Sequence, residues 1–303
     1  MKELNIISQL LNKRFFKSIF QLLIVGYLIY QIGQIGLKNF LVSIPLNPLF
    51  YIIYIIIYIS LPTIEYIIYE KKWNFIGKKL IRALFKKKVL NTDVLGYSGE
   101  VFLFIWAKEN INQNKSSIIS FIKDNNIISS LSSGIISFAL LLYFIINGYI
   151  NTDYIYFLKD RKIVLYFFTI IIFLIVILIY FKKNIFYVKL LEGIQIFLLH
   201  SVRILIINVL QIFQWSLVMP EIALSVWFTY SAVQIIISRI PFLPSLDALF
   251  VNIILELSDL LFVSQDLIIG MLTMNIVFNR LLNLGIYASN IYQENLKHEN
   301  TQK

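Results

Sequence analysis

The chain has 303 residues, of which 58% are apolar or aromatic and only 15% are charged. Soluble globular proteins contain about 25% charged residues, so this composition excludes an ordinary soluble domain and predicts an integral membrane protein. The formal net charge of +10 would suit nucleic acid, but the basic residues at 71–88 flank apolar runs, which favours anionic phospholipids as partners and excludes nucleic acid.

The apolar runs are continuous, without the alternation of a membrane β-barrel, so we expect an all-α, polytopic transmembrane bundle. A first span is predicted over 16–37 and a second over 47–69, where Pro48 suits the opening of a helix. The basic block that follows contains an amphipathic pattern over 75–88, which is typical of a helix at the membrane surface.

The distribution of basic residues predicts the orientation of the chain. Lys13, Arg14 and Lys17 precede the first span, and the basic block 71–88 follows the second, so both groups should lie on one side of the membrane. The positive-inside rule places that side in the cytoplasm. An even number of spans returns the polar tail 291–303 to the same side, so both termini are expected to be cytoplasmic.

The stretch 89–107 is too short and too broken for a full span. Gly96 and Gly99 favour a turn or a close approach of two backbones, and Glu100 begins a short apolar helix. We therefore expect a re-entrant or half-buried segment here, followed by a cytoplasmic loop over 108–126.

The rest of the chain is predicted to contain spans at 127–149, 163–181, 201–219 and 221–239, an interfacial helix at 185–199, and membrane segments at 247–263 and 267–289. Pro241 and Pro244 interrupt it. In lipid, an interrupted helix leaves backbone N–H and C=O groups that need hydrogen bonds from protein or trapped water. We therefore expect this break to lie in the interior of the bundle or beside a cavity. The prediction is about eight membrane segments, some re-entrant or broken, in one integral membrane domain over 1–303.

Charged and amide side chains at membrane depth are costly, so they mark candidate functional sites. Two predicted helices each carry such a stripe at helical spacing, Asn252, Glu256 and Asp259 on one and Asn275, Asn279 and Asn283 on the other. Arg280 lies beside the second stripe. We expect Glu256 or Asp259 to pair with Arg280; the alternative is that Asp259 lies at the membrane surface near a helix end.

Four short motifs occur in a fixed order: Gly99-Glu100 after the basic amphipathic helix, Glu192-Gly193-Ile-Gln before a span, Pro241-x-x-Pro244, and Asn279-Arg280-Leu-Leu in the last span. In these motifs, over about residues 10–290, the chain resembles the flippase-like membrane region of lysylphosphatidylglycerol synthases and the related stand-alone integral membrane proteins. The resemblance implies a protein of the bacterial inner membrane that binds or moves phospholipids or lipid-linked headgroups.

The charges and the motifs together predict a lipid-headgroup site at Glu100, Arg239, Glu256 and Arg280, with backbone breaks at Gly99, Pro241 and Pro244. Arginine suits phosphate because its planar fork donates two hydrogen bonds at once. Glu100 and Glu256 would balance the charge of the arginines or would contact an amine of the headgroup. Arg239 has an alternative role as an interfacial anchor beside the proline pair.

The chain departs from the family pattern at two of these motifs. Leu103 stands where an arginine is expected, and Ser245-Leu246-Asp247 stand where glycines usually follow the prolines. These departures favour an alternative function, a non-catalytic membrane subunit that docks onto a larger membrane protein complex.

We expect no enzymatic activity and no cofactor. The sequence has no cysteine and two histidines, which excludes thiol catalysis and a cysteine or histidine metal cluster. No Ser-His-Asp arrangement or phosphate-binding glycine loop occurs. The aminoacyl transfer of the resembling synthases belongs to a soluble domain after the membrane region, whereas this sequence ends at Lys303, so that reaction is not expected either.

Overall fold

The computed structural model describes residues 44–94, 97–148, 186–238, 246–260, 263 and 265–300, and every regular element in these ranges is a helix. Four helices there are long and apolar enough to cross a membrane: α3 (Pro48–Trp73), α6 (Lys115–Ile146), α10 (Leu190–Ser216) and residues Leu267–Ser289 of α13 (Gln265–Asn300). The predicted all-α class is thus confirmed for the described residues, and the four helices suggest a membrane-embedded protein. The predicted spans 16–37 and 163–181 lie outside the described residues, as do Arg239, Pro241 and Pro244.

The second span forms as its local sequence predicts. The Asn47 side chain caps α3 by accepting a hydrogen bond from the Leu49 backbone N–H at 3.0 Å, and Pro48 occupies the first turn, where no intrahelical donor is needed. Lys71 and Lys72 in the last turn favourably oppose the negative end of the helix dipole. The helix begins and ends within a few residues of the predicted bounds.

Two predicted boundaries were wrong. Most of the predicted loop 108–126 is helical, because α5 ends at Asn110 and α6 begins at Lys115 and runs for 32 residues. Its polar residues resemble a loop, but Ile118, Phe121 and Ile122 recur at helical spacing and are buried. The predicted interfacial helix 185–199 and the predicted span 201–219 are likewise one 27-residue helix, α10.

The other four described helices are short. α4 (Lys78–Asp93) and α5 (Ser98–Asn110) enclose the turn predicted around Gly99, and α11 (Leu224–Ile237) and α12 (Leu246–Leu260) flank the predicted proline break. The last two contain 14 and 15 residues, or about 21 and 23 Å of helix, less than the roughly 30 Å of a hydrocarbon core. Neither reaches the length predicted for a span at 221–239 or 247–263.

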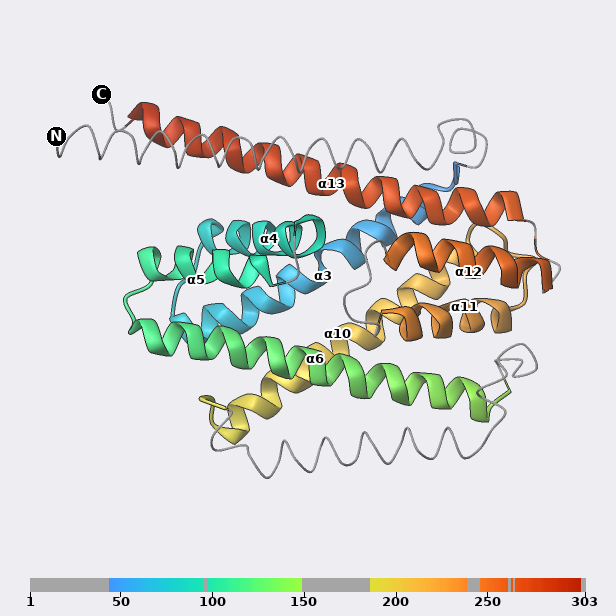
Figure 1. Cartoon of the computed structure of the whole chain (residues 1–303), viewed down its shortest axis with the longest axis horizontal. Coiled ribbons are helices and arrows are strands. Elements are labelled where there is room, and N and C mark those ends of the chain that lie inside the picture. Colours follow the sequence, from blue (N-terminus) through green and yellow to red (C-terminus); the bar gives the residue numbers. More distant parts are fainter. Residues whose placement is uncertain are drawn as a thin grey trace.

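The short helices form two hairpins in opposite halves of the molecule. Figure 1 shows α4 and α5 in one half of its length, and α11 and α12 in the other, with the long helices running through both. The α4/α5 hairpin packs on α3, α6 and α13, and the α11/α12 hairpin packs on α10, α6 and α13. The C-terminal end of α13 lies at the same end of the molecule as the junction of α5 and α6 (Figure 1).

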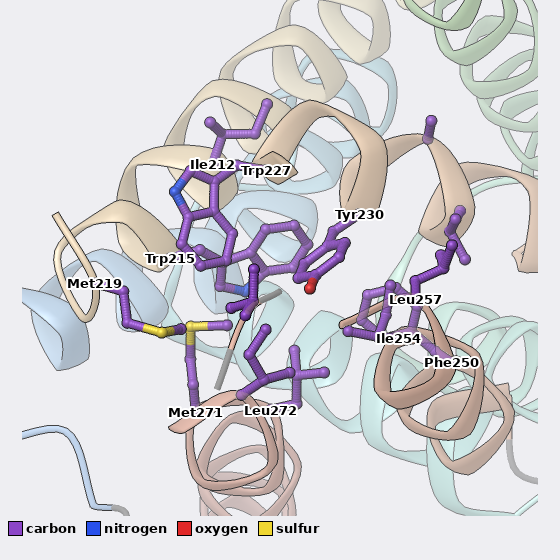
Figure 2. Close-up of a cluster of buried hydrophobic side chains, with 14 of the residues drawn as sticks. Ile212, Trp215, Met219, Trp227, Tyr230, Phe250, Ile254, Leu257, Met271 and Leu272 are labelled. Carbon is purple, nitrogen blue, oxygen red and sulfur yellow. The ribbon is translucent and has the colours of Figure 1, made fainter. Parts of the chain in front are cut away.

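Each hairpin has its own apolar core. Around α4 and α5, the core consists of side chains such as Tyr69, Trp73, Leu80, Leu84, Leu103, Ile118 and Phe121. Around α11 and α12, it consists of side chains such as Ile212, Trp215, Met219, Trp227, Tyr230, Ile254, Met271 and Leu272 (Figure 2). Helices α3, α6 and α10 contribute to both cores, and α13 contributes to the core around α11 and α12.

Candidate functional site

A layer of polar side chains occupies the middle of the bundle, between the two apolar cores. We call it the polar layer; it consists of Tyr58, Glu65, Lys87, Lys88, Asp93, Glu100, Asn125, His200, Arg203, Arg280 and Asn283. His200 lies ten residues after the start of α10 at Leu190, or about 15 Å along the helix, which is half the thickness of a hydrocarbon core. An unpaired charge at that depth of a hydrocarbon core would be costly.

Lys87 on α4 is the centre of the first cluster in this layer. Its ammonium donates to the carboxylate of Glu65 on α3, and it lies 3.4 Å from the carboxylate of Glu100 on α5. Lys87 and Glu65 are only 3% and 4% exposed. One buried cation thus joins two carboxylates from two other helices, which offsets the cost of removing all three charges from water.

Two neutral residues extend this cluster to α6 and α10. The Asn125 amide donates to the Tyr69 hydroxyl at 3.3 Å and lies 3.5 Å from Glu65. The Asn125 carbonyl oxygen lies 3.2 Å from Nε2 of His200, which can donate to it. The cluster therefore connects α3, α4, α5, α6 and α10 through a continuous set of polar contacts.

Gly99 brings α5 close enough to α4 for these contacts. A Cβ at this position would lie 2.2 Å from the Lys87 carbonyl oxygen, a distance that real Cβ atoms do not reach. The Gly99 backbone N–H donates to the Asn91 side chain at 2.7 Å, and the Asn91 amide donates to Glu100 at 3.1 Å. Glu100 is thus positioned by the turn itself, in the first turn of α5, where the helix dipole favours a negative charge.

Arg280 on α13 is the centre of the second cluster. Its guanidinium donates to the carboxylate of Asp93 at the end of α4. The Asn283 amide donates to the other Asp93 oxygen at 2.7 Å, and the Tyr58 hydroxyl donates to Asn283 at 2.6 Å. The last span is thereby joined to α3 and to the tip of the α4/α5 hairpin.

Lys88 and Arg203 complete the layer and differ from the other cations. Lys88 donates to the backbone carbonyl of Tyr58 and lies 3.3 Å from the centre of the Tyr58 ring. Arg203, three residues after His200, has a buried Nε without a hydrogen-bond partner. None of the ion pairs between described residues includes either side chain.

Of the four residues predicted to line one headgroup site, the structure describes three: Glu100, Glu256 and Arg280. Glu100 and Arg280 both lie in the polar layer, in the Lys87 cluster and the Asp93 cluster respectively. Glu256 is exposed on α12, so the predicted pairing of Glu256 with Arg280 is wrong, and Arg280 binds the carboxylate of Asp93. The other predicted partner of Arg280, Asp259, stays a prediction. Arg239 and the Asp259 side chain lie outside the description.

Lys87 was not predicted as a site residue, because it belongs to the basic block 71–88, which is expected at the membrane surface. A signal for it exists, because Leu80, Ala83 and Leu84 form an apolar stripe on α4 whose next helical position is Lys87. Asp93 carries no comparable signal, since its partner Arg280 is 187 residues away in the sequence.

Within the described ranges, no group of three His, Cys, Asp or Glu side chains could hold a metal ion. Comparisons with protein-family models, with curated proteins and with solved structures found no match for this chain.

Proposed function

We propose that this protein binds the polar headgroups of membrane lipids in its polar layer and moves them across the bilayer, as the flippase-like proteins it resembles are expected to do. The observation that carries this proposal is the depth of the ionised side chains. Glu65, Lys87, Asp93 and Arg280 are all less than 9% exposed and lie near the middle of helices that are long and apolar enough to span a membrane, or are held against them.

The physical argument concerns the barrier to a charged headgroup. A charge at the bilayer centre costs about 3 kcal/mol or more, so a phosphate does not cross the hydrocarbon unaided. Arginine and lysine at that depth would bind the phosphate, and Glu100 would bind an amine or balance the cations. The carboxylates that already pair with these cations hold them in place until a headgroup competes for them.

The two hairpins support the same proposal. We propose that α4/α5 and α11/α12 are re-entrant segments that enter the bilayer from opposite sides and turn back near its middle. Broken helices that enter from opposite sides are typical of secondary transporters, whose binding sites lie near the midplane. At the tip of α4/α5, Tyr97 has a left-handed backbone (φ 70°), so the helical path is broken there.

The basic residues support an inner-membrane orientation with cytoplasmic termini. Lys71, Lys72 and Lys78 lie at one end of α3 and α4, and Figure 1 places the C-terminal end of α13 at that same end of the molecule. The positive-inside rule assigns this end to the cytoplasm.

Translocation can be tested with purified protein in vesicles that contain a trace of phosphatidylglycerol labelled on its headgroup. A membrane-impermeant reductant bleaches label only in the outer leaflet, so translocation appears as bleaching beyond half of the label. We expect wild-type protein to exceed this limit, and Glu100→Gln and Arg280→Lys to lower the rate about tenfold. The exposed matched controls Glu109→Gln and Arg82→Gln should keep the wild-type rate. Wild-type vesicles that bleach no further than protein-free vesicles would contradict the proposal.

A second candidate function is a non-transporting subunit of a larger membrane complex. The pairing of Lys87 with Glu65 and of Arg280 with Asp93 favours it, because a helical bundle without a transport function also needs its buried charges to be paired. Purification from the native membrane in mild detergent separates the two functions. Stoichiometric co-purification with other chains, together with wild-type growth of the Glu100→Gln strain, would support the subunit.

A further inference from the structure

We propose that Lys88 and Arg203 form a binding site for one phosphate group, open to the lipid along one side of α10. This inference rests on the proposed lipid-binding function and names the group that the site recognises. It starts from the charges in the polar layer, where Lys87 pairs with Glu65 and Glu100, and Arg280 pairs with Asp93. Lys88 and Arg203 are the two cations of the layer that form no ion pair with a described carboxylate.

Two cations without a paired carboxylate lower the stability of the folded protein, and a bound anion would offset this loss. Desolvation of an ammonium or guanidinium is unfavourable unless an anion accepts its hydrogen bonds. Burial and the charge of Arg203 both disfavour the ammonium of Lys88, and the Asp93 carboxylate offsets this only in part. With every acidic and basic side chain ionised, the described residues of the polar layer comprise four cations and three carboxylates, a surplus of one positive charge. A phosphodiester carries one negative charge and would neutralise this surplus.

The donors suit a phosphate in particular. The buried Nε of Arg203 lacks a partner, and Nε together with one terminal nitrogen forms the fork that binds two phosphate oxygens. Lys88 donates to the Tyr58 carbonyl, which accounts for one of the three hydrogens of its ammonium. Lys88 therefore keeps donors for the same anion.

The position of Arg203 on α10 indicates how a lipid would reach it. Arg203 is half-buried, between the fully buried His200 and the exposed Val202 and Ile206. The exposed face continues with Leu205 and Val209, an aliphatic strip against which an acyl chain can pack. The phosphate would bind at the edge of the polar layer while its chains stay outside the bundle.

The test measures binding by native mass spectrometry of the full chain in detergent, with dioleoylphosphatidylglycerol, dioleoylglycerol and inorganic phosphate as probes. Wild-type protein should retain one phosphatidylglycerol and bind dioleoylglycerol, which has the same chains without phosphate, at least about tenfold more weakly. Arg203→Gln and Lys88→Gln should each weaken phosphatidylglycerol binding about tenfold, whereas the exposed controls Arg82→Gln and Lys79→Gln should not.

Inorganic phosphate identifies the source of the group. Competition by millimolar phosphate would support the site with free phosphate as a ligand, and resistance to it would support a lipid phosphate. Equal binding of phosphatidylglycerol by wild type, Arg203→Gln and Lys88→Gln would overturn the site, and so would equal binding of dioleoylglycerol. If Arg203→Gln aggregates, Arg203→Lys replaces it in the test. This variant keeps the positive charge but loses the two-donor guanidinium, and it is expected to bind phosphatidylglycerol a few-fold more weakly than wild type.

Failure of this site is distinguishable from failure of the proposed transport. Binding that depends on Arg203 in a protein that translocates no lipid would retain the site and contradict transport. Translocation at the wild-type rate in Arg203→Gln would retain transport and overturn the site.

Discussion

The two hairpins have similar lengths and opposite positions, but different side chains hold them. In α4/α5, the backbones meet at Gly99, and α4 carries Lys87 and Asp93, which pair with Glu65 on α3 and Arg280 on α13. In the α11/α12 half, Trp227 and Tyr230 of α11 pack edge-on with ring centres 5.7 Å apart, and Met219 and Met271 from outside the hairpin lie close together (Figure 2).

This difference predicts how each half responds to substitution. A buried charge requires a particular partner, so each charge in the α4/α5 half fixes the position of another helix. Aromatic packing requires mainly that volume be filled, and it tolerates exchanges of similar size. Effects in the first half should therefore depend on the partner, and effects in the second half should scale with the volume removed.

The largest expected effect comes from Lys87→Met, which leaves Glu65 and Glu100 without their shared cation. Breaking a buried ion pair by removing one partner costs about 3–5 kcal/mol, and two carboxylates are affected here, so we expect a loss of about 5 kcal/mol. The free energy of unfolding in detergent, measured by denaturant titration, provides the check. Lys79→Met, at an exposed position of the same helix, should change it by less than about 0.5 kcal/mol.

The dependence on a partner is tested by a second substitution. Adding Glu65→Gln to Lys87→Met removes one of the two unpaired carboxylates and should recover about half of the loss. A double variant that is less stable than Lys87→Met would contradict the assignment of the cost to unpaired charge.

A smaller loss is expected from Trp227→Ala in the other hairpin. Trp227 is fully buried, and truncation of a large aromatic side chain leaves a cavity, for which we expect about 3 kcal/mol. Trp227→Phe should lose less, in proportion to the smaller volume removed, and Phe213→Ala on the exposed face of α10 should lose little. Equal losses for Trp227→Phe and Trp227→Ala would contradict a dependence on volume.

Gly99→Ala tests the close approach in the first hairpin and should cost about 2 kcal/mol, because the new Cβ displaces α5 from the Lys87 carbonyl. The matched control is Gly134→Ala in α6, where a Cβ meets nothing within 4 Å. Alanine is the better helix former there, so this variant should be neutral or more stable by up to about 1 kcal/mol. Melting temperatures measured in one detergent compare the two, and a Gly99→Ala as stable as Gly134→Ala would exclude the close approach.

The same contrast explains what the sequence could and could not predict. Apolar runs predict α3 and the last span well, because helices in a membrane need only length and hydropathy to be recognised. The turn near Gly99 and the position of Glu100 at the start of a short helix were also predictable, since glycine and helix-start signals are local. The start of α6 was not, because its polar residues outweigh the buried stripe of Ile118 and Phe121.

The partners of the charges were beyond sequence reasoning. Arg280 was recognised as a site candidate from its depth in a span, but nothing local distinguishes Asp93 from the exposed Glu256 as its partner. Which carboxylate pairs with Arg280 depends on the packing of α4 against α13, a contact between residues far apart in the chain. A single sequence indicates which side chains need a partner and leaves the partner open.

The smallest effect is expected at the aqueous end of the first half, where Lys72 of α3 pairs with Glu192 of α10 at 2.8 Å. Their side chains are 22% and 31% exposed, so water screens the pair, and Glu192→Gln should cost less than about 1 kcal/mol. In 1 M salt, where the Debye length is about 3 Å, even this loss should largely disappear, whereas the loss from Lys87→Met should persist. Unfolding titrations of both variants at low and high salt make the comparison. Glu192→Gln could instead lose as much free energy of unfolding as Lys87→Met, with no dependence on salt. That result would contradict the contrast between the buried ion pairs and the more exposed pair of Lys72 and Glu192.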